Sequence, residues 1–402
     1  MTIADLDTHL AAFRRGAVDL IETQDLEARL KEALGAGRGL RVKFGMDPSS
    51  PDLHVGHAVQ LRKLRDLQDL GHTIVLIVGD STAMVGDPSG RNKLRPQLTR
   101  EAVEENLVTY TEQARLVLDM DRTEVRRNSE WFDAMGFEEV LRLASRMTVA
   151  QMIQRDTFQK RMEESAPIGI HEFLYPLMQG WDSVQIECDV ELGGTDQLFN
   201  LLVGRQLQEQ VGQVPQIVLT QPLINGLDGR KMSKSYGNTI QLTDAAGDVF
   251  GKTMSITDEA MSTWFLYLTR LEQDEIDAVL AGHPREAKAR LGEELAGFLH
   301  GADAGREARA AFDRQFQAKA LPDEIPERVH AEWPAEGQPL PVLLREVGLA
   351  SSSSEARRLV QQGGVRLDGE VVQDVKRMVA PPSEPLLVQV GKRKFLRLLP
   401  QD

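Results

Sequence analysis

The chain has 402 residues, of which 41% are hydrophobic and 27% are charged. This composition is typical of a globular protein with two or three domains and excludes an intrinsically disordered chain. The longest apolar run, residues 73–79, is too short to cross a bilayer, and the charges spread over residues 1–30 argue against a secretory signal. A single cysteine, Cys188, excludes an intramolecular disulfide, so we expect a reducing, cytoplasmic setting without membrane contact.

The first part of the chain alternates strand and helix patterns. Residues 40–44 have the pattern of a short buried strand, residues 47–52 form a turn, and residues 73–79 form the next strand, with a helix between them. The helix is expected to bury Leu61, Leu64 and Leu67 and to expose Arg62, Lys63, Arg65 and Asp66. This βαβ unit predicts an α/β fold with a Rossmann-like parallel sheet.

The rest of the chain has a different character. After Thr239 the pattern is helical, with helix starts at Thr257 and Pro284, and we expect an all-helical domain over residues 239–331. A Pro/Gly-rich stretch, residues 333–339, ends it. Residues 338–402 carry a net charge of +3, whereas the whole chain carries −14, which predicts a separate basic module with its own partner.

The first motif with chemical meaning joins the first strand to its helix. His54 and His57 share one face at the helix start, with Gly56 between them. A helix N-terminus offers free amides to a phosphate, and a glycine lets a nucleotide approach the backbone. Two histidines can also be metal ligands, but no third ligand lies nearby, so we expect no metal site. The structural alternative is that the pair only caps and packs the helix.

The second motif follows an Asp-Gly turn at residues 228–229. Within residues 231–235 two lysines and two serines surround Met232, a composition suited to wrapping a triphosphate. Taken alone, this segment could equally be a solvated basic loop. The two motifs lie 177 residues apart and bracket the α/β region.

Together the two motifs resemble the signatures of class I aminoacyl-tRNA synthetases. HVGH (54–57) is similar to the HIGH signature, and residues 231–235 read KMSKS. Residues 80–95, 175–182 and 193–197 resemble the pocket segments of tyrosyl-tRNA synthetases. The resemblance implies ATP with Mg²⁺, L-tyrosine and tRNA(Tyr) as substrates, no tightly bound cofactor, and a homodimer. It also implies a catalytic domain over 1–238 with a dimer-forming insertion at about 120–180, and an anticodon-binding role for 239–331.

The resemblance also assigns residue roles. The residues expected to contact tyrosine are Thr82, Asp87, Tyr175, Gln179, Asp182 and Gln197, with Asp182 on the phenol hydroxyl. Those expected to bind ATP are Gly45, Asp47, Gly56, Gly194, Asp196, Met232 and Ser233. Those expected to act on the phosphates and the adenosine are Ser49, His54, His57, Arg91, Arg95, Lys231 and Lys234.

The spacing of three of these residues agrees with the resemblance. Tyr175, Gln179 and Asp182 stand at i, i+4 and i+7, so one helical face presents all three, although an amphipathic helix with a polar seam has the same spacing. One position departs from the family. Many relatives have a second tyrosine for the phenol where this chain has Lys43, so the hydroxyl is expected to rest on Asp182 alone or on a group that the sequence does not identify.

The basic module, residues 338–402, resembles a small RNA-binding fold shared with ribosomal proteins. Residues 343–349 and 354–360 are expected to form two short helices, the second with Ser354 as N-cap, and residues 363–372 a hairpin with an Asp-Gly turn. Arg357, Arg358 and Arg366 are the candidate phosphate contacts, and a surface that merely happens to be basic is the alternative.

Three alternatives to a tyrosine-specific enzyme remain open at this point. One is a tryptophanyl-type synthetase, which generally lacks a basic C-terminal module. Another is a catalytically silent RNA-binding relative, which would be expected to lose His54 or the lysines of residues 231–235. The third is a shorter nucleotidyltransferase with an H-x-G-H motif, which would have no KMSKS segment.

Overall fold

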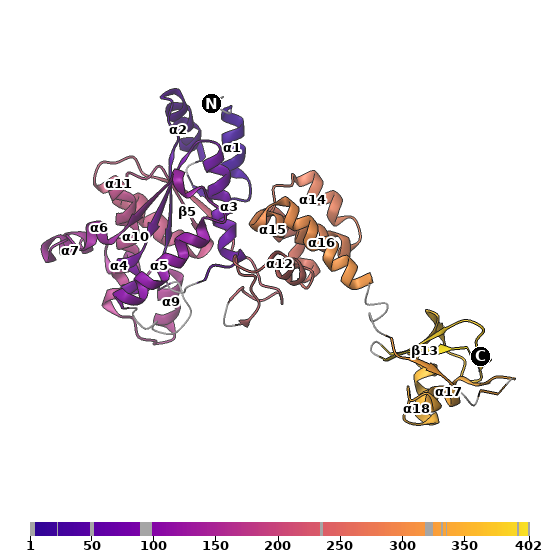
Figure 1. Ribbon diagram of the computed structural model, residues 1–402. Coiled ribbons are helices and arrows are strands. Elements are labelled where there is room, and N and C mark those ends of the chain that lie inside the picture. Colours follow the sequence, from indigo (N-terminus) through magenta and orange to yellow (C-terminus); the bar gives the residue numbers. More distant parts are fainter. Residues whose placement is uncertain are drawn as a thin grey trace. The chain divides into compact units, whose positions relative to one another are not determined.

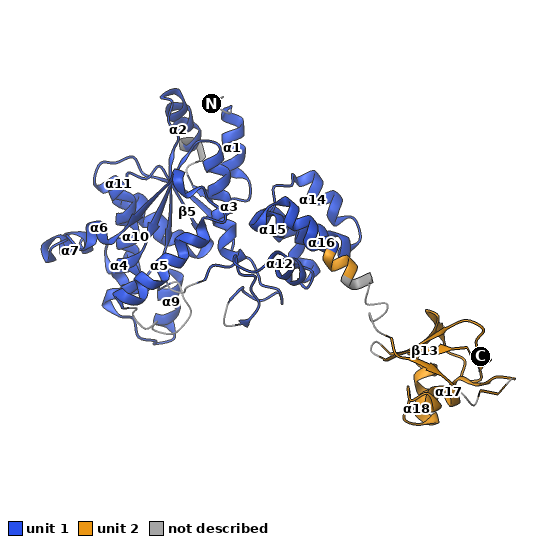
Figure 2. Ribbon diagram, in the orientation of Figure 1, with its two compact units in different colours: residues 1–310 blue, residues 311–402 orange. Residues whose placement is uncertain are grey.

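The structure is a computed structural model that describes residues 5–21, 23–48, 52–88, 99–233, 236–317, 325–330, 333–334, 336–391 and 394–400. It divides into two compact units, residues 1–310 and residues 311–402, and each is described by itself (Figure 2). No helix in the described part of the chain is long and apolar enough to cross a membrane.

The first unit is built around a six-stranded sheet with the order β1-β6-β5-β2-β3-β4 (Figure 1). The strands are β1 (Leu20–Ile21), β2 (Arg41–Met46), β3 (Thr73–Val78), β4 (Thr123–Arg127), β5 (Val190–Gly194) and β6 (Ile217–Gln221). Strands β2 to β6 are parallel, and only the short edge strand β1 is antiparallel, paired with β6. The predicted Rossmann-like parallel sheet is therefore confirmed.

The predicted βαβ unit is present as β2, α3 (Val55–Asp69) and β3. Leu61, Leu64 and Leu67 are fully buried, as the spacing predicted. The prediction that Arg62 and Lys63 face solvent was wrong, because both are buried. The Lys63 ammonium donates to the Ala12 and Arg15 carbonyls at the end of α1 (Leu6–Arg14), and the Arg62 guanidinium lies over the Phe298 ring. Both contacts come from segments distant in sequence.

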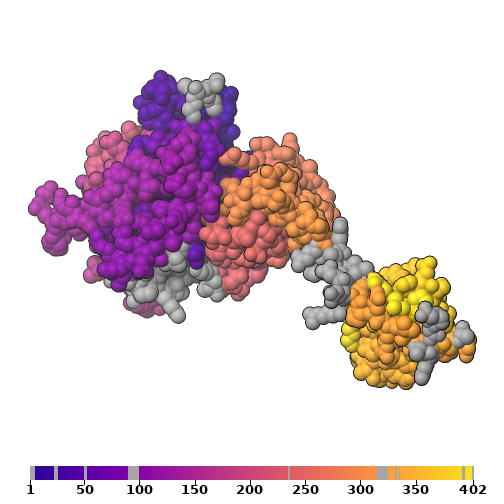
Figure 3. Space-filling model, viewed as in Figure 1, coloured from indigo at the N-terminus to yellow at the C-terminus, as the bar shows by residue number. Residues whose placement is uncertain are grey.

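Further helices pack around the sheet and extend from it. They are α2 (Thr23–Gly35), α4 (Asp80–Val85), α5 (Arg100–Ala114), α6 (Ser129–Phe132), α7 (Phe137–Ala144), α8 (Val149–Met152), α9 (Asp156–Glu163), α10 (Leu174–Gln185) and α11 (Leu198–Gln210). Helices α10 and α11 pack closely against each other. The segment with α6 and α7 projects from the body of this unit (Figures 1 and 3).

The region after residue 245 is helical. Its helices are α12 (Ala246–Thr253), α13 (Met261–Leu268), α14 (Gln273–Leu280), α15 (Pro284–His300) and α16 (Ala302–Gln317), the last of which continues past residue 310. The predicted helix start at Pro284 is confirmed, with His283 as the N-cap, and Thr257 caps a short 3₁₀ turn, Asp258–Ala260, that leads into α13. Trp264 and Phe265 of α13 are fully buried in the packing of this region.

The second unit is a small α+β fold. Its sheet has the order β10-β9-β12-β13-β7, with β8 paired to β11 beside it. The elements are β7 (Glu327–Val329), β8 (Gln338–Pro339), α17 (Leu340–Glu346), α18 (Ser353–Gln361), β9 (Val365–Leu367), β10 (Glu370–Val372), β11 (Met378–Val379), β12 (Leu386–Val390) and β13 (Lys394–Leu399). Because β7 pairs with β13, residues 327–329 belong to this sheet, although the sequence pattern placed them in the helical domain.

Two local predictions for this unit can be compared with the structure. The hairpin of β9 and β10 turns at Asp368 and Gly369, which have φ values of 44° and 87°, as an Asp-Gly two-residue turn requires. The predicted N-cap was wrong by two residues: Ser352, not Ser354, accepts the hydrogen bond from the Glu355 amide at the start of α18.

Candidate active site

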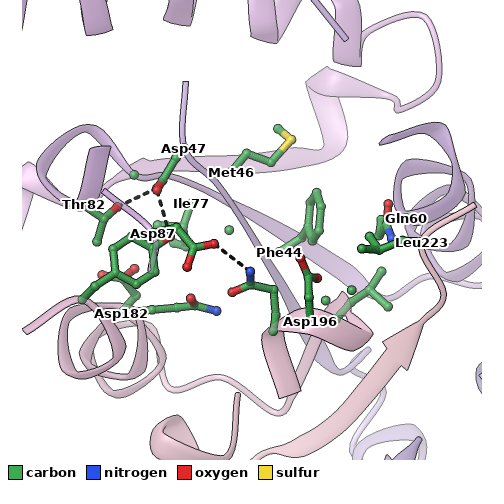
Figure 4. A pocket seen from close by; sticks show the side chains of 18 residues that line it. Phe44, Met46, Asp47, Gln60, Ile77, Thr82, Asp87, Asp182, Asp196 and Leu223 are labelled. Atoms are coloured by element: carbon green, nitrogen blue, oxygen red, sulfur yellow. Dashed lines mark hydrogen bonds between the residues drawn. The ribbon is translucent and has the colours of Figure 1, made fainter. Parts of the chain in front are cut away.

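A cavity of about 220 Å³ opens where the strand order of the first unit changes direction (Figure 4). The chain runs from β2 outward to β3 and β4, and then continues on the other side of β2 with β5 and β6. The carboxyl ends of β2 and β5 therefore diverge, which is where parallel α/β sheets bind ligands. We call this space the switch-point cavity. It is lined by Gly45, Asp47, Thr82, Asp87, Tyr175, Gln179, Asp182, Gly194, Asp196 and Gln197, among others.

Asp47, directly after β2, organises one side of the cavity. Its carboxylate accepts hydrogen bonds from Tyr175 Oη (2.8 Å) and Thr82 Oγ1 (2.7 Å). Burial and the negative charges of Asp47 and Asp87 raise the pKa of Tyr175, so the phenol stays protonated. The Tyr175 oxygen thus donates its proton to Asp47 and retains lone pairs that can accept from an ammonium group.

A hydrogen-bond chain fixes the neighbouring polar side chains. Asp87 accepts from Gln197 Nε2 (2.8 Å) and pairs with Arg155 Nη2 (3.2 Å). Asn200 Nδ2 donates to both Gln197 Oε1 (2.8 Å) and Gln179 Oε1 (2.9 Å). Sequence reasoning missed Asn200 and Arg155. Asn200 stands three residues after Gln197, a helical spacing that could have revealed it, whereas Arg155 comes from the insertion and has no such pattern.

Asp182 on α10 is a buried carboxylate that lines the cavity. Trp131 Nε1 donates to its Oδ1 (3.0 Å) and Asn128 Nδ2 to its Oδ2 (3.5 Å). Burial raises the pKa of Asp182 to about 7, while the charge of Lys43 and these two hydrogen bonds oppose the rise. A carboxylate has about four acceptor positions, so Asp182 can still accept a hydrogen bond from a ligand hydroxyl.

Lys43 does not reach into the cavity. Its buried ammonium forms an ion pair with Glu191 (2.8 Å) and donates to the Gln179 carbonyl (2.7 Å) and Ser183 Oγ (2.8 Å). Three donor hydrogens thus have three acceptors inside the protein. Position 43 therefore holds an internal ion pair, and Asp182 lines the cavity together with its two donors outside the lining, Trp131 and Asn128.

The two histidines of the first motif cap α3. His54 Nδ1 accepts from the Gly56 amide (3.1 Å), and His57 Nδ1 accepts from the His54 amide (3.1 Å). An imidazole whose Nδ1 accepts carries its proton on Nε2 when it is neutral. Burial lowers the pKa of His54 to about 3 and that of His57 to about 4, so both rings are neutral at physiological pH. Each ring can offer one uncharged N–H donor.

The second motif lies beside the first. The Met232 sulfur is a near neighbour of Gly56: a Cβ built on Gly56 would lie 3.3 Å from it and 2.8 Å from the His54 ring. A side chain at position 56 would therefore collide with the histidine. Residues 240–242 run antiparallel to residues 53–55, with Val55 N bonded to Ile240 O (2.9 Å) and Leu242 N to Leu53 O (3.0 Å).

Lys231 extends this convergence to the switch-point cavity. Burial and the Asp87 charge raise the pKa of Asp196, and the Lys231 charge opposes that rise. The early histidine pair and the late lysine segment therefore adjoin each other, and the Lys231 charge acts on Asp196 in the cavity lining.

Comparisons with known proteins identify the family. Residues 36–317 match the family model of "tRNA synthetases class I (W and Y)", and residues 338–383 match the S4 domain. The Tyrosine--tRNA ligase of Thermotoga maritima is 52% identical over 392 residues, covering 96% of both chains. That of Thiobacillus denitrificans is 51% identical, covering 97% of this chain and 98% of its own. The chain belongs to the tyrosyl-tRNA synthetase family.

Solved structures of the tyrosyl-tRNA synthetase family share the fold. The tyrosyl-tRNA synthetase of Archaeoglobus fulgidus complexed with L-tyrosine aligns with a TM-score of 0.60 at 21% identity, over 76% of this chain and all of its own. A C-terminally truncated mitochondrial enzyme of Aspergillus nidulans aligns with a TM-score of 0.64 at 23% identity, over 77% of this chain and 94% of its own. The activity is therefore tyrosine–tRNA ligation, and not that of a tryptophanyl-type synthetase or of a catalytically silent RNA-binding relative.

The residues expected from the tyrosyl-tRNA synthetase resemblance fall into three groups. All six expected tyrosine contacts line the cavity, as do four of the expected ATP contacts, namely Gly45, Asp47, Gly194 and Asp196. The lining does not include His54, Gly56, His57, Lys231, Met232 and Ser233, which lie in the two motifs described above. Ser49, Arg91, Arg95 and Lys234 lie outside the described residues. Sequence reasoning missed the lining residue Gln60, a buried amide on α3.

The three arginines expected to bind RNA lie in the second unit, within or next to the S4 match. Arg357 and Arg358 lie on α18 and Arg366 on β9, and all three are exposed. Within the described part of the chain, none of the three is in an ion pair. Exposed arginines without carboxylate partners are suited to contact phosphates.

Proposed function

We propose that the switch-point cavity activates L-tyrosine with ATP and that the tyrosyl group then passes to the 3′ end of tRNA(Tyr). In the first step the tyrosine carboxylate attacks the α-phosphate, the bond to the β-phosphate breaks, and tyrosyl-adenylate and pyrophosphate form. In the second step a ribose hydroxyl of tRNA attacks the tyrosyl carbonyl and AMP leaves. The observation that carries the proposal is a single cavity with a hydroxyl acceptor, Asp182, and an ammonium site around Tyr175, next to the two signature motifs.

Tyrosine is oriented by its two polar ends. The ammonium group meets Asp87, Gln179 and the Tyr175 oxygen, and the phenol hydroxyl donates to Asp182, which Trp131 holds in place. Phenylalanine would leave the buried Asp182 carboxylate without that donor, which costs about 1–3 kcal/mol or more for a charged group. The cavity thereby favours tyrosine.

The phosphates are placed by neutral and charged donors together. His54 and His57 offer uncharged Nε2–H groups at the N-terminus of α3, where the positive end of the helix dipole also favours an anion. Lys231 supplies positive charge to the departing pyrophosphate, and Asp196 accepts from the ribose hydroxyls. Catalysis then rests on positioning and charge stabilisation, without a covalent enzyme intermediate.

The remaining expected groups complete this arrangement. Ser49, Arg91, Arg95 and Lys234 are proposed to contact the phosphates, and ribose or adenine packs against the backbone at Gly45 and Gly194. Mg²⁺ enters with ATP on the phosphate oxygens, since Mg²⁺ usually binds through substrate phosphates and retains waters. We propose that the reaction takes place in the cytoplasm.

The decisive experiment is amino-acid-dependent exchange of radioactive pyrophosphate into ATP, run with each amino acid in turn. Exchange with tyrosine, followed by charging of tRNA(Tyr), is expected. Exchange driven by tryptophan, or no exchange with any amino acid, would refute the proposal. The Lys231→Ala variant should slow adenylate formation by about 100-fold while leaving the tyrosine Kd within about twofold, since Lys231 acts on charge that develops late. A large loss of tyrosine affinity in that variant would contradict the role given to Lys231.

Two surfaces of the chain are proposed to bind macromolecules. Arg357, Arg358 and Arg366 are proposed to contact tRNA phosphates. A second copy of the chain is proposed to cover apolar side chains in the insertion, where Phe137 is 78% exposed and Ile170 is 85% exposed. Exposed apolar side chains in a projecting segment are typical of an interface between subunits.

A further inference from the structure

Arg62, on α3, is a buried cation for which the described residues provide no hydrogen bond or ion pair. Its side chain is only 6% exposed, and it lies over the Phe298 ring at 4.8 Å. Among the described residues no carboxylate or carbonyl accepts a hydrogen bond from its guanidinium. Burial lowers the pKa of Arg62 to about 10; the charges of Asp66 and Glu294 oppose this shift, those of Arg270 and Arg15 add to it, and the group stays charged at neutral pH. A buried charge without a direct hydrogen-bond partner is costly, and a ligand that supplies one would be favoured.

Arg62 opens onto a cavity that is rich in arginine. This second cavity has a volume of about 680 Å³ and lies between α3 and the helices α15 and α16. Its arginines are Arg62, Arg65, Arg270, Arg290 and Arg306, and we call it the arginine cavity. It shares no lining residue with the switch-point cavity. The Nε atom of Arg290 is a second buried donor in this cavity for which the described residues provide no acceptor.

The acids around the arginine cavity are already paired with other arginines. Asp66 and Asp69 pair with Arg270 at 3.0 and 2.7 Å, and Asp69 also pairs with Arg65 at 2.8 Å. The two glutamates of the lining are likewise used: Glu293 pairs with Arg309 (2.9 Å) and Glu294 with Arg290 (2.7 Å). These pairs hold the rim arginines in place, and the described residues provide no hydrogen bond for the Arg62 guanidinium or the buried Arg290 Nε.

We propose that the arginine cavity binds a phosphate group through Arg62 and Arg290. A guanidinium presents several donors in one plane, which suits the oxygens of a phosphate, and a buried guanidinium gains more from such a bond than an exposed one. Two sources of this chemistry are a backbone phosphate of tRNA and a free phosphate anion. The tRNA source rests on the proposed function, and the free anion does not.

The experiment uses the full chain in four forms: wild type, Arg62→Met, Arg306→Gln and the control Arg38→Gln. Arg306 and Arg38 are matched, because each is an exposed arginine in one ion pair. Arg306 lines the arginine cavity, and Arg38 does not. Arg62→Met keeps the packing over Phe298 and removes the donors. If Arg62→Met does not fold, Arg306→Gln still tests the cavity, because Arg306 contributes positive charge to the lining, and an anion bound there should lose affinity when that charge is removed.

Two titrations distinguish the sources. In the first, tRNA affinity is measured from 50 to 300 mM KCl. Arg62→Met should weaken binding about tenfold at low salt and make the slope of log K against log salt shallower by about 1. In the second, inorganic phosphate is titrated while the melting temperature is followed, and Arg62→Met should lose the stabilisation that the wild type shows. An effect in the first titration alone assigns the site to tRNA, and an effect in the second alone assigns it to a free anion.

The proposal is overturned if the variants match Arg38→Gln in both titrations, because Arg62 would then be only a packing partner of Phe298. Tyrosine-dependent pyrophosphate exchange is measured in every form and should be unchanged. If the wild type shows no exchange, the proposed function fails, and the phosphate titration still decides whether the arginine cavity binds an anion.

Discussion

The buried ion pair between Lys43 and Glu191 is the feature whose removal should most clearly affect both stability and tyrosine binding. The two residues face each other on adjacent parallel strands, β2 and β5, and both side chains are almost completely buried. Lys43 uses its three hydrogens on Glu191, Ser183 and the Gln179 carbonyl, and Glu191 also accepts from Ser183 Oγ (3.1 Å) and from Gln216. Both charged groups are hydrogen-bonded within the protein, so each charge depends on the other.

Lys43→Met removes the ammonium, keeps the length of the side chain and leaves the Glu191 carboxylate buried without its counter-charge. Breaking a buried pair from one side costs about 3–5 kcal/mol, so the free energy of unfolding should fall by that amount, and Glu191→Gln should have a similar cost. Removing both charges in Lys43→Met/Glu191→Gln eliminates the unpaired charge. The double variant should therefore cost less than the sum of the single variants by at least about 2 kcal/mol.

Urea unfolding of all four forms measures this cycle, and equilibrium binding of tyrosine adds a functional readout. Because the Lys43 ammonium holds the Gln179 carbonyl, the tyrosine Kd should rise in Lys43→Met together with the loss of stability. Lys31→Met, which breaks an exposed ion pair with Glu27, is the matched control and should change neither quantity by more than about 0.5 kcal/mol. Single variants that cost less than about 1 kcal/mol, or strictly additive costs, would refute the reasoning.

Three further results are expected. Burial lowers the pKa of His72 to about 3, so below pH 6.5 the unfolded chain takes up a proton that the folded chain does not. The free energy of unfolding should therefore fall by about 2 kcal/mol between pH 8 and pH 5. A His72→Gln variant should lose this part of the pH dependence in urea titrations. Because the pKa of Asp182 is about 7 and the phenol donates to the ionised carboxylate, the tyrosine Kd should rise about tenfold from pH 8 to pH 6. In Trp131→Phe, which lacks one donor to Asp182, the midpoint of this pH profile should move to higher pH. A flat profile in both forms would contradict this role for Asp182. Phe137→Asp should dissociate the proposed homodimer in sedimentation velocity, and an unchanged dimer would exclude this surface as the interface.

The local pattern of the sequence was sufficient for the βαβ unit. Leu61, Leu64 and Leu67 have a helical period, and two short apolar runs flank them, so the helix and both strands could be predicted. The same reasoning held for the start of α15 and for the Asp-Gly hairpin, because a proline at a helix start and a glycine with positive φ act within a few residues. Local chemistry determines such features, and the sequence displays it.

The polar groups of the site depended on contacts that no local pattern reveals. The donors to Asp182 are Asn128 and Trp131, which follow β4 and are more than 50 residues away. Arg155 reaches Asp87 from the insertion in the same way. The histidines show the same limit: His72 shares a hydrogen bond of 2.9 Å with His9, which lies 63 residues earlier in the chain. Resemblance to the family predicted substrate contacts, but it did not predict the residues that hold those side chains in place.

Three buried cations on the same βαβ unit show why the surroundings of a charge, and not its presence, carry information. Lys43 is neutralised by Glu191, and Lys63 by carbonyls at the negative end of α1. Both charges are satisfied within the chain, so both are explained by the fold alone. Arg62 is as deeply buried as Lys63, but the described residues give it no direct partner, and the nearby Asp66 and Glu294 pair with Arg270 and Arg290 instead. Asp66 and Glu294 offset the Arg62 charge only from a distance, and this lack of a direct partner is why we propose Arg62, and not Lys43 or Lys63, as a binding residue.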